Sequence, residues 1–290
     1  MKRSDVVEDA LREANALASR SDAAGALTVL RRLPLDDFAD LVLEAPEDYP
    51  DLATLLPRMP PDQVQINWAG NYGRALLAQS LGFVRVISQA FEHATSRPLN
   101  SATVLDYGCG WGRHLRLMSA FIPPERLYGV DPWDQSIDLC RQYGVHARLE
   151  VSDYVPRSPP FGSIPFDLVY AFSVFTHLSK KTTHQVQKTI RSRIHPDGLA
   201  VITIRPVEYW RAHREALPFG ETIESLIRTH EESGFAFAPH NRLPIDGDIT
   251  YGDTSISLDY ISQEWSGWVI EGVETLPVDP YQTIVLLRPR

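Results

Sequence analysis

Residues 106–112 have the sequence Asp-Tyr-Gly-Cys-Gly-Trp-Gly, the most informative stretch of the chain. They follow the apolar run 103–105 and precede a segment, 113–120, whose composition favours a helix. Glycines at every second position let the backbone turn sharply and approach a ligand closely, because a Cβ at any of them would block that approach. The helix that follows would offer unpaired N–H groups to an anion. The stretch therefore predicts a ligand-binding loop between a strand and a helix.

The spacing of the glycines indicates which ligand binds. A dinucleotide-binding loop has the pattern G-x-G-x-x-G, and Arg113 stands where its third glycine should be. The observed pattern is D-x-G-x-G-x-G, with Asp106 ending the strand, and it resembles motif I of the class I S-adenosylmethionine-dependent methyltransferases. In that family the ligand has an amino-acid carboxylate where a dinucleotide has a pyrophosphate. The resemblance implies S-adenosylmethionine as cofactor.

Further features follow in the order that this family shows. Strands are expected over 126–131, 146–151, 166–172 and 199–204, and they alternate with helices. Such alternation indicates a mostly parallel sheet that binds ligands at the carboxyl ends of its strands. Two extended runs, 268–274 and 281–287, resemble the antiparallel hairpin that closes the family's sheet. The expected fold is therefore α/β, Rossmann-like, with a seven-stranded sheet of the class I methyltransferase type.

The resemblance also assigns cofactor-binding residues to these strand ends. Asp131 lies about 20 residues beyond the glycine loop, the offset at which a carboxylate meets ribose hydroxyls, although an Asp at a strand end is often a helix cap. Trp133 is expected to cover the adenine ring or to pack in the core. Asp153 is expected near the adenine amino group. The complete expected set is Asp106, Gly108, Gly110, Gly112, Asp131, Trp133, Asp153 and Ser173.

Helical periodicity and punctuation by proline and glycine divide the chain into three parts. Residues 1–60 are expected to form a helical N-terminal appendage, and a homodimer through these helices is possible. Residues 61–100 are expected to form a substrate-side segment and a helix. Residues 101–290 would be the methyltransferase domain, with an insertion at 206–256 that acts as a lid and a helix over 258–265 capped by Ser257.

The acceptor side of the site is less specific in sequence. An activated methyl group needs an aligned acceptor and exclusion of water, with a base only where the acceptor must lose a proton. His177 is the first candidate base, and a structural role that ties its loop to the sheet is the alternative; His240 is a second candidate. Aromatic and amide side chains suit recognition of a polar organic acceptor. The candidates are Trp68, Asn71, Tyr72, Asp248 and Tyr251.

Two phrases carry a narrower resemblance. Residues 64–76 and 251–260 are similar to bacterial methyltransferases found with glycosyltransferases in polysaccharide or glycosylated natural-product pathways. The resemblance implies O-methylation of a sugar hydroxyl or of a related small polar molecule.

The amino-acid composition indicates which binding partners and which cell compartment to expect. The chain has 28 Lys and Arg against 37 Asp and Glu, a formal net charge of −9, which argues against nucleic acid because that partner is bound mainly by neutralising phosphates. Cys109 and Cys140 have no metal-ligand spacing and suggest a reducing compartment, so we expect no metal and a cytoplasmic protein. No stretch reaches the ~18 apolar residues of a membrane span, so we expect a soluble protein.

Two other functions remain open from the sequence. A nicotinamide-dependent oxidoreductase would use the same loop and Asp131, although Arg113 argues against it. A noncatalytic binding or regulatory protein would keep the cofactor fold and use residues 1–60 and the insertion to hold a partner.

Overall fold

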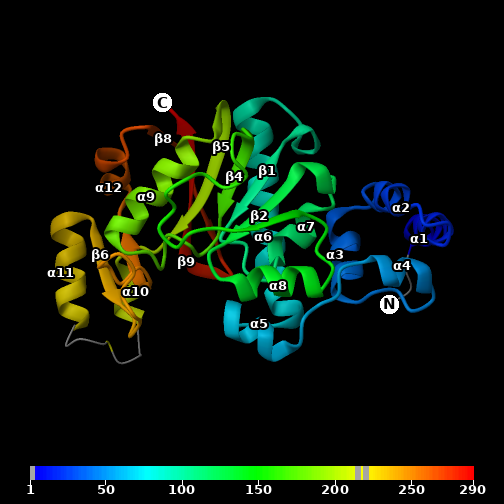
Figure 1. Cartoon of the computed structure of the whole chain (residues 1–290), viewed down its shortest axis with the longest axis horizontal. Helices are drawn as coiled ribbons and strands as arrows, with labels where there is room; N and C mark the ends of the chain where they lie inside the picture. Colours follow the sequence, from blue (N-terminus) through cyan, green and yellow to red (C-terminus); the bar gives the residue numbers. More distant parts are fainter. Residues whose placement is uncertain (1–3, 213–216, 218–221) are drawn as a thin grey trace.

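Seven strands form one mixed sheet in the computed structural model, which describes residues 4–212, 217 and 222–290. Their order is β3-β2-β1-β4-β5-β9-β8; the first five are parallel, and β9 pairs antiparallel with both β5 and β8 (Figure 1). This order confirms the predicted class I methyltransferase fold. The strands are β1 (Val104–Tyr107), β2 (Leu127–Asp131), β3 (Arg148–Val151), β4 (Phe166–Ala171), β5 (Ile194–Ile204), β8 (Trp268–Leu276) and β9 (Asp279–Pro289).

Helices cover both faces of the sheet because its central strands are apolar on both sides. Val104 and Leu168 belong to the core beneath α6, α7 and α8, whereas their neighbours Leu105 and Val169 belong to the core beneath α9 and α12. Parallel strands that are buried on both faces have near-continuous apolar sequences, as β1 and β4 do. The covering helices are α6 (Gly73–Thr95), α7 (Arg113–Met118), α8 (Asp134–Gln142), α9 (Lys180–Arg191) and α12 (Leu258–Glu264).

The strands extend beyond the predicted ranges in two places. Phe166 pairs with Ile194 and Leu168 pairs with Leu199, so β5 begins before the predicted strand at 199–204 and contains an irregularity at residues 195–198. The closing hairpin turns at residues 277 and 278; β8 extends two residues beyond the predicted run at its C-terminal end, and β9 two residues at both ends. Short 3-10 turns at Leu99–Ser101 and Pro124–Arg126 precede β1 and β2.

Five helices precede α6, and the first four share an apolar cluster. On α1, Val7, Leu11 and Ala14 are buried in this cluster. One contact between this cluster and the rest of the chain is the hydrogen bond from Arg31 Nε to Ser119 O (3.0 Å), just after α7. The predicted homodimer through these helices stays a prediction. The five helices are α1 (Asp5–Ala18), α2 (Ala23–Leu30), α3 (Leu35–Leu43), α4 (Pro50–Leu55) and α5 (Asp62–Ala69).

The described residues between β5 and α12, in the region predicted as an insertion, form two helices and a small separate sheet. The helices are α10 (Glu208–Ala212) and α11 (Ile223–Ser233). The sheet is the antiparallel pair β6 (Phe235–Pro239) and β7 (Gly252–Ile256). Ser257 caps α12 as predicted, since its Oγ accepts from Tyr260 N (3.0 Å).

None of the helices in the described part of the chain is long and apolar enough to cross a membrane.

Candidate active site

The glycine loop joins β1 to α7 at the carboxyl edge of the sheet and is held against the end of β2. Gly108 N and Cys109 N both donate to Val130 O at 2.8 Å. Gly110 N donates to Asp131 Oδ2 at 2.9 Å. The loop is therefore fixed to the neighbouring strand by backbone groups and by one carboxylate.

Two glycines of the loop are required for different reasons. Gly108 has φ +78°, and a Cβ there would lie 2.4 Å from Val174 Cγ2, so packing within the protein excludes larger residues. Gly110 has φ +54°, and a Cβ there would lie 3.4 Å from Trp68 Cδ1. The sequence attributed the glycines to close approach of a ligand, whereas at Gly108 the backbone conformation and Val174 already demand glycine.

Asp131 ends β2 with both carboxylate oxygens engaged. While Oδ2 accepts from the loop, Oδ1 accepts from Trp133 N at 2.9 Å, which fixes the turn into α8. Burial raises the pKa of Asp131, and the hydrogen bonds from Trp133 and Gly110 oppose that shift. Asp131 therefore has both expected features: its carboxylate accepts from backbone N–H groups at the start of α8 and in the glycine loop, and it also lines a pocket.

A pocket of about 520 Å³ opens at the ends of β1, β2 and β4. This volume lies within the range of roughly 300–1,000 Å³ typical of small-molecule sites, and the position is the switch point between β1 and β4. Eight of the predicted site residues line it, namely Trp68, Gly108, Gly110, Asp131, Trp133, Ser173, His177 and Tyr251. Other lining residues were not predicted, among them Asn67, Arg113, His114, Ser136, Tyr154, Arg242 and Thr250.

Two tryptophans cover the glycine loop. The rings of Trp68 and Trp133 stack with centroids 4.7 Å apart and planes at 9°. Trp68 Nε1 donates to Ser136 Oγ at 3.1 Å, which fastens α5 to α8. Residues of the predicted substrate-side segment thus lie directly over the predicted cofactor loop.

Arg113 is a partly buried cation in the wall of the pocket. It donates to Gln79 Oε1, and its guanidinium carbon lies 4.9 Å from the ring centroid of Phe172. Burial lowers its pKa to about 10, against the effect of the nearby Asp106 and Asp279, so it remains charged at pH 7. In the sequence analysis, Arg113 served only as evidence against a dinucleotide-binding loop. Its position directly after the glycine loop was the signal that could have predicted a side chain facing the ligand.

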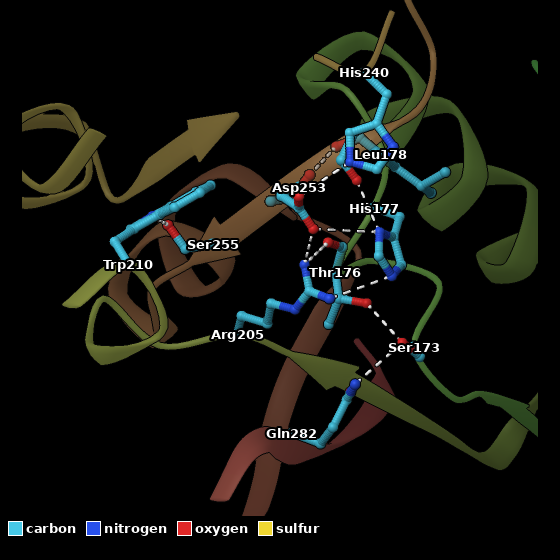
Figure 2. Close-up of polar contacts among 12 residues, drawn as sticks. Ser173, Thr176, His177, Leu178, Arg205, Trp210, His240, Asp253, Ser255 and Gln282 are labelled. Atoms are coloured by element: carbon cyan, nitrogen blue, oxygen red, sulfur yellow. Dashed lines mark hydrogen bonds and ion pairs between the residues drawn. The ribbon is translucent and has the colours of Figure 1, made fainter. Parts of the chain in front are cut away.

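His177 follows β4 and is fixed through both ring nitrogens (Figure 2). Its Nδ1–H donates to Gly252 O (2.8 Å), while Nε2 accepts from Arg205 Nη2 (3.3 Å). Burial and then the Arg205 charge lower the pKa of His177 to about 4, so the ring is neutral at pH 7. Its ring also stacks on Tyr251, with centroids 4.9 Å apart.

Asp253 on β7 joins the two candidate histidines. Its Oδ1 accepts from Arg205 Nη1 and lies 3.7 Å from His177 Nδ1 (Figure 2). Its Oδ2 lies 3.0 Å from His240 Nε2. Burial alone would raise the pKa of Asp253, but Arg205 and the histidines outweigh it and lower the pKa to about 2. The carboxylate is therefore ionised and fully committed to holding this cluster.

Ser173 adopts an unusual backbone conformation at the end of β4, with φ +57°. Its N–H donates to Thr203 Oγ1 (2.7 Å), and its Oγ accepts from Gln282 Nε2 (3.0 Å). A non-glycine residue in the left-handed region is kept there by its surroundings, and such positions cluster at functional sites. These two hydrogen bonds thus fix the wall of the pocket between β1 and β4.

The remaining predicted residues do not line this pocket. Asp106 is buried behind the loop, where burial raises its pKa well above the usual range, and Gly112 is the N-cap of α7. Asp153 is exposed in the loop after β3, and the next residue in the sequence, Tyr154, lines the pocket. Asp248 accepts from Ser179 Oγ, the N-cap of α9. Asn71 and Tyr72 are exposed between α5 and α6. His240 contacts Asp253 and is not among the residues that line the pocket.

Comparisons with known proteins agree with this geometry. Residues 104–198 match the family model described as a methyltransferase domain. An uncharacterized protein of Rickettsia prowazekii (strain Madrid E) is 24% identical over 156 residues, which are 52% of this chain and 58% of that protein. A tRNA U34 carboxymethyltransferase of Shewanella sp. (strain W3-18-1) is 32% identical over 112 residues, 36% of this chain and 32% of that enzyme. The chain thus spans between a third and three fifths of these curated relatives.

The fold has a structural counterpart in the PH0226 protein from Pyrococcus horikoshii OT3. The TM-score is 0.50 at 15% identity, over 72% of this chain and 90% of that structure, which shows a shared fold. The sheet order, the glycine loop and the family match together show that residues 104–198 belong to a methyltransferase domain with the class I fold.

Replacement of Asp131 tests its cofactor role. Asp131→Ala should weaken S-adenosylhomocysteine binding by about 1–3 kcal/mol, because the hydrogen bonds from Gly110 N and Trp133 N and the predicted ribose contact are lost together. Calorimetric titration measures this, with Asp138→Ala on the exposed side of α8 as the matched control. Equal affinities in the two variants would contradict the assignment, provided that both melt near the wild-type temperature.

The lowered pKa of His177 predicts a pH-dependent stability. Since protonation is harder in the folded state (pKa about 4) than at the ordinary 6.5, His177 contributes fully to stability above pH 6.5 and the contribution is lost as pH falls toward 4. Between pH 7 and 5 this loss is roughly 2 kcal/mol for the single site. Urea unfolding of wild type and His177→Gln at both pH values should show the smaller loss in the variant. The same loss in both would show that His177 is not the group responsible.

Proposed function

We propose that this chain transfers a methyl group from S-adenosylmethionine to a hydroxyl oxygen of a small molecule or glycan. One observation supports this more than any other: the same pocket is lined by cofactor-type residues and by His177, Thr250 and Tyr251. The two phrases that carry the narrower resemblance, 64–76 and 251–260, provide Trp68 and Tyr251 to this pocket. The sequence similarity to glycan-pathway enzymes and the pocket lining therefore agree.

The residues present fit the cofactor. Asp131 is a buried carboxylate suited to paired ribose hydroxyls, and Trp133 has an aromatic face suited to adenine. Arg113 is a cation without an acid in ion-pair contact among the described residues, and it suits the methionine carboxylate. Asp153, exposed after β3, stays a predicted contact to the adenine amino group. When bound, S-adenosylmethionine supplies a methyl group on a positively charged sulfur, which becomes a neutral thioether once the methyl has been transferred.

His177 is the residue that we propose takes the hydroxyl proton. Its Nδ1–H is committed to Gly252 O, so Nε2 carries the lone pair, and the only donor near it in the described chain is Arg205 at 3.3 Å. Arg205 itself is held more closely by Asp253 and Thr176 O. A pKa of about 4 makes His177 a weak base that stays in its basic form throughout the neutral range.

His240 acts in this proposal through other residues. It lies 3.0 Å from Asp253 and meets the Tyr251 ring edge-on, with centroids 5.4 Å apart. It therefore positions the acceptor end of the pocket and does not touch the reacting atoms. The segment 206–256 provides Arg242, Thr250 and Tyr251 to the pocket, which supports its proposed role as a lid.

The relative that acts on tRNA suggests a different acceptor class. The formal net charge of −9 argues against it, because nucleic-acid binding depends on neutralising phosphates with Lys and Arg. We therefore propose a small or glycan acceptor in preference to RNA.

A methyl-transfer screen tests this function. With labelled S-adenosylmethionine, sugars and phenols should be methylated and matched amines should not. His177→Gln should lower kcat by about 10²-fold, near the lower end for general bases because its pKa is low, and leave S-adenosylhomocysteine affinity nearly unchanged. Wild-type kcat/KM should stay level from pH 8 to 5 and fall toward pH 4 as His177 is protonated.

The matched control is His184→Gln, since His184 on α9 contacts Tyr260 (2.8 Å) away from the pocket. An apparent pKa near 6.5, or an unchanged kcat in His177→Gln, would favour the scaffold role for His177. Methylation of amines alone would overturn O-methylation.

A further inference from the structure

Arg242 lies at the end of the pocket that the proposed function gives to the acceptor. It belongs to the connection between β6 and β7 and lines the pocket beside Thr250 and Tyr251. Its guanidinium carbon lies 4.2 Å from the ring centroid of Tyr251. The same ring stacks on His177, with centroids 4.9 Å apart and planes at 4°, and meets His240 edge-on at 5.4 Å. A cation is thus held one aromatic ring away from His177.

The three acids within residues 235–256, the stretch that contains Arg242, are engaged elsewhere. Asp246 in the same connection pairs with Arg157 at 2.8 Å. Asp248 accepts hydrogen bonds from Ser179 and Thr182. Asp253 accepts from Arg205 and is within hydrogen-bond distance of His240. Within residues 4–212, 217 and 222–290, the Arg242 guanidinium has no ion pair and no hydrogen bond. Its charge is therefore not neutralised by the described part of the chain.

Two tyrosines, each with a hydroxyl group, line the same pocket as Arg242. Tyr154 and Tyr251 line the same pocket, and the structure assigns neither hydroxyl a hydrogen bond in the described chain. A guanidinium stacked on an aromatic ring is held in one plane and presents its N–H groups as a fork. That fork matches a carboxylate or a phosphate in geometry as well as in charge. In a chain of net charge −9, such a cation at a pocket is a selective feature.

We propose that the methyl acceptor carries an anionic group, a carboxylate or a phosphate, and that Arg242 supported by Tyr251 is the specificity-determining residue that binds it. The inference rests on the proposed function, which places the acceptor at this end. Arg113 serves the cofactor carboxylate in the same pocket, so the two arginines bind different anions. His177 would then lie next to the hydroxyl of an acceptor whose charge is anchored on Arg242.

Binding measurements on the full chain saturated with S-adenosylhomocysteine test this without turnover. The probes are matched pairs titrated by calorimetry and ligand-observed NMR: D-glucuronate and D-glucose 6-phosphate against D-glucose, and 4-hydroxybenzoate against 4-hydroxybenzamide. At least one anion should bind about 10-fold or more tightly than its uncharged partner. The carboxylate and phosphate arms distinguish the two kinds of anion.

Variants assign any preference to Arg242. Arg242→Gln should abolish the preference, Arg242→Lys should keep part of it, and both should bind S-adenosylhomocysteine within about two-fold of wild type. Arg157→Gln, which removes an exposed arginine already paired with Asp246, is the matched control and should retain the full preference. The inference is overturned if no anion binds, if uncharged partners bind equally well, or if the preference survives Arg242→Gln. Failure to bind S-adenosylhomocysteine would instead remove the proposed function and this inference with it.

Discussion

The attachment of the glycine loop to the end of β2 is the constraint on which the site depends. Val130 O receives two loop N–H groups, and Asp131 receives a third. These bonds place the turn from β1 into α7 beside the carboxyl ends of β2 and β4, where the switch in strand order leaves a crevice. Every other part of the pocket, from the Trp68 cover to the Ser173 wall, is built around this fixed edge.

The charges of the pocket form two separate groups. Asp131 and Arg113 lie at the loop end, where burial raises the pKa of the acid and lowers that of the base. Beside His177, Asp253 accepts from Arg205 and lies 3.0 Å from His240. Burial and the Arg205 charge keep His177 neutral, and on the proposed acceptor side the Arg242 guanidinium has no ion pair within the part of the chain described here.

The sheet could be predicted from sequence because its strands are short apolar runs separated by clear helix signals, and the resemblance of the glycine loop to motif I implies their order. The loop side of the pocket could be placed too, since Asp131 and Trp133, which line it, occupy set offsets from that loop, although their contacts to the cofactor stay a prediction. The acceptor side could not be predicted in the same way. The β6–β7 pair has a polar second strand that is buried by tertiary contacts, and Arg242 reaches the pocket only through that pairing. Asp248 looked equally suitable in sequence, yet it caps α9 through Ser179.

Calorimetric titration of the full chain with S-adenosylhomocysteine, beside NAD under the same conditions, tests the central claim most directly. The account predicts saturable binding of S-adenosylhomocysteine on the order of micromolar, at one site per chain, and no binding of NAD. Binding of NAD in its place, or of neither ligand, would contradict the assignment of the pocket between β1 and β4 as a class I cofactor site.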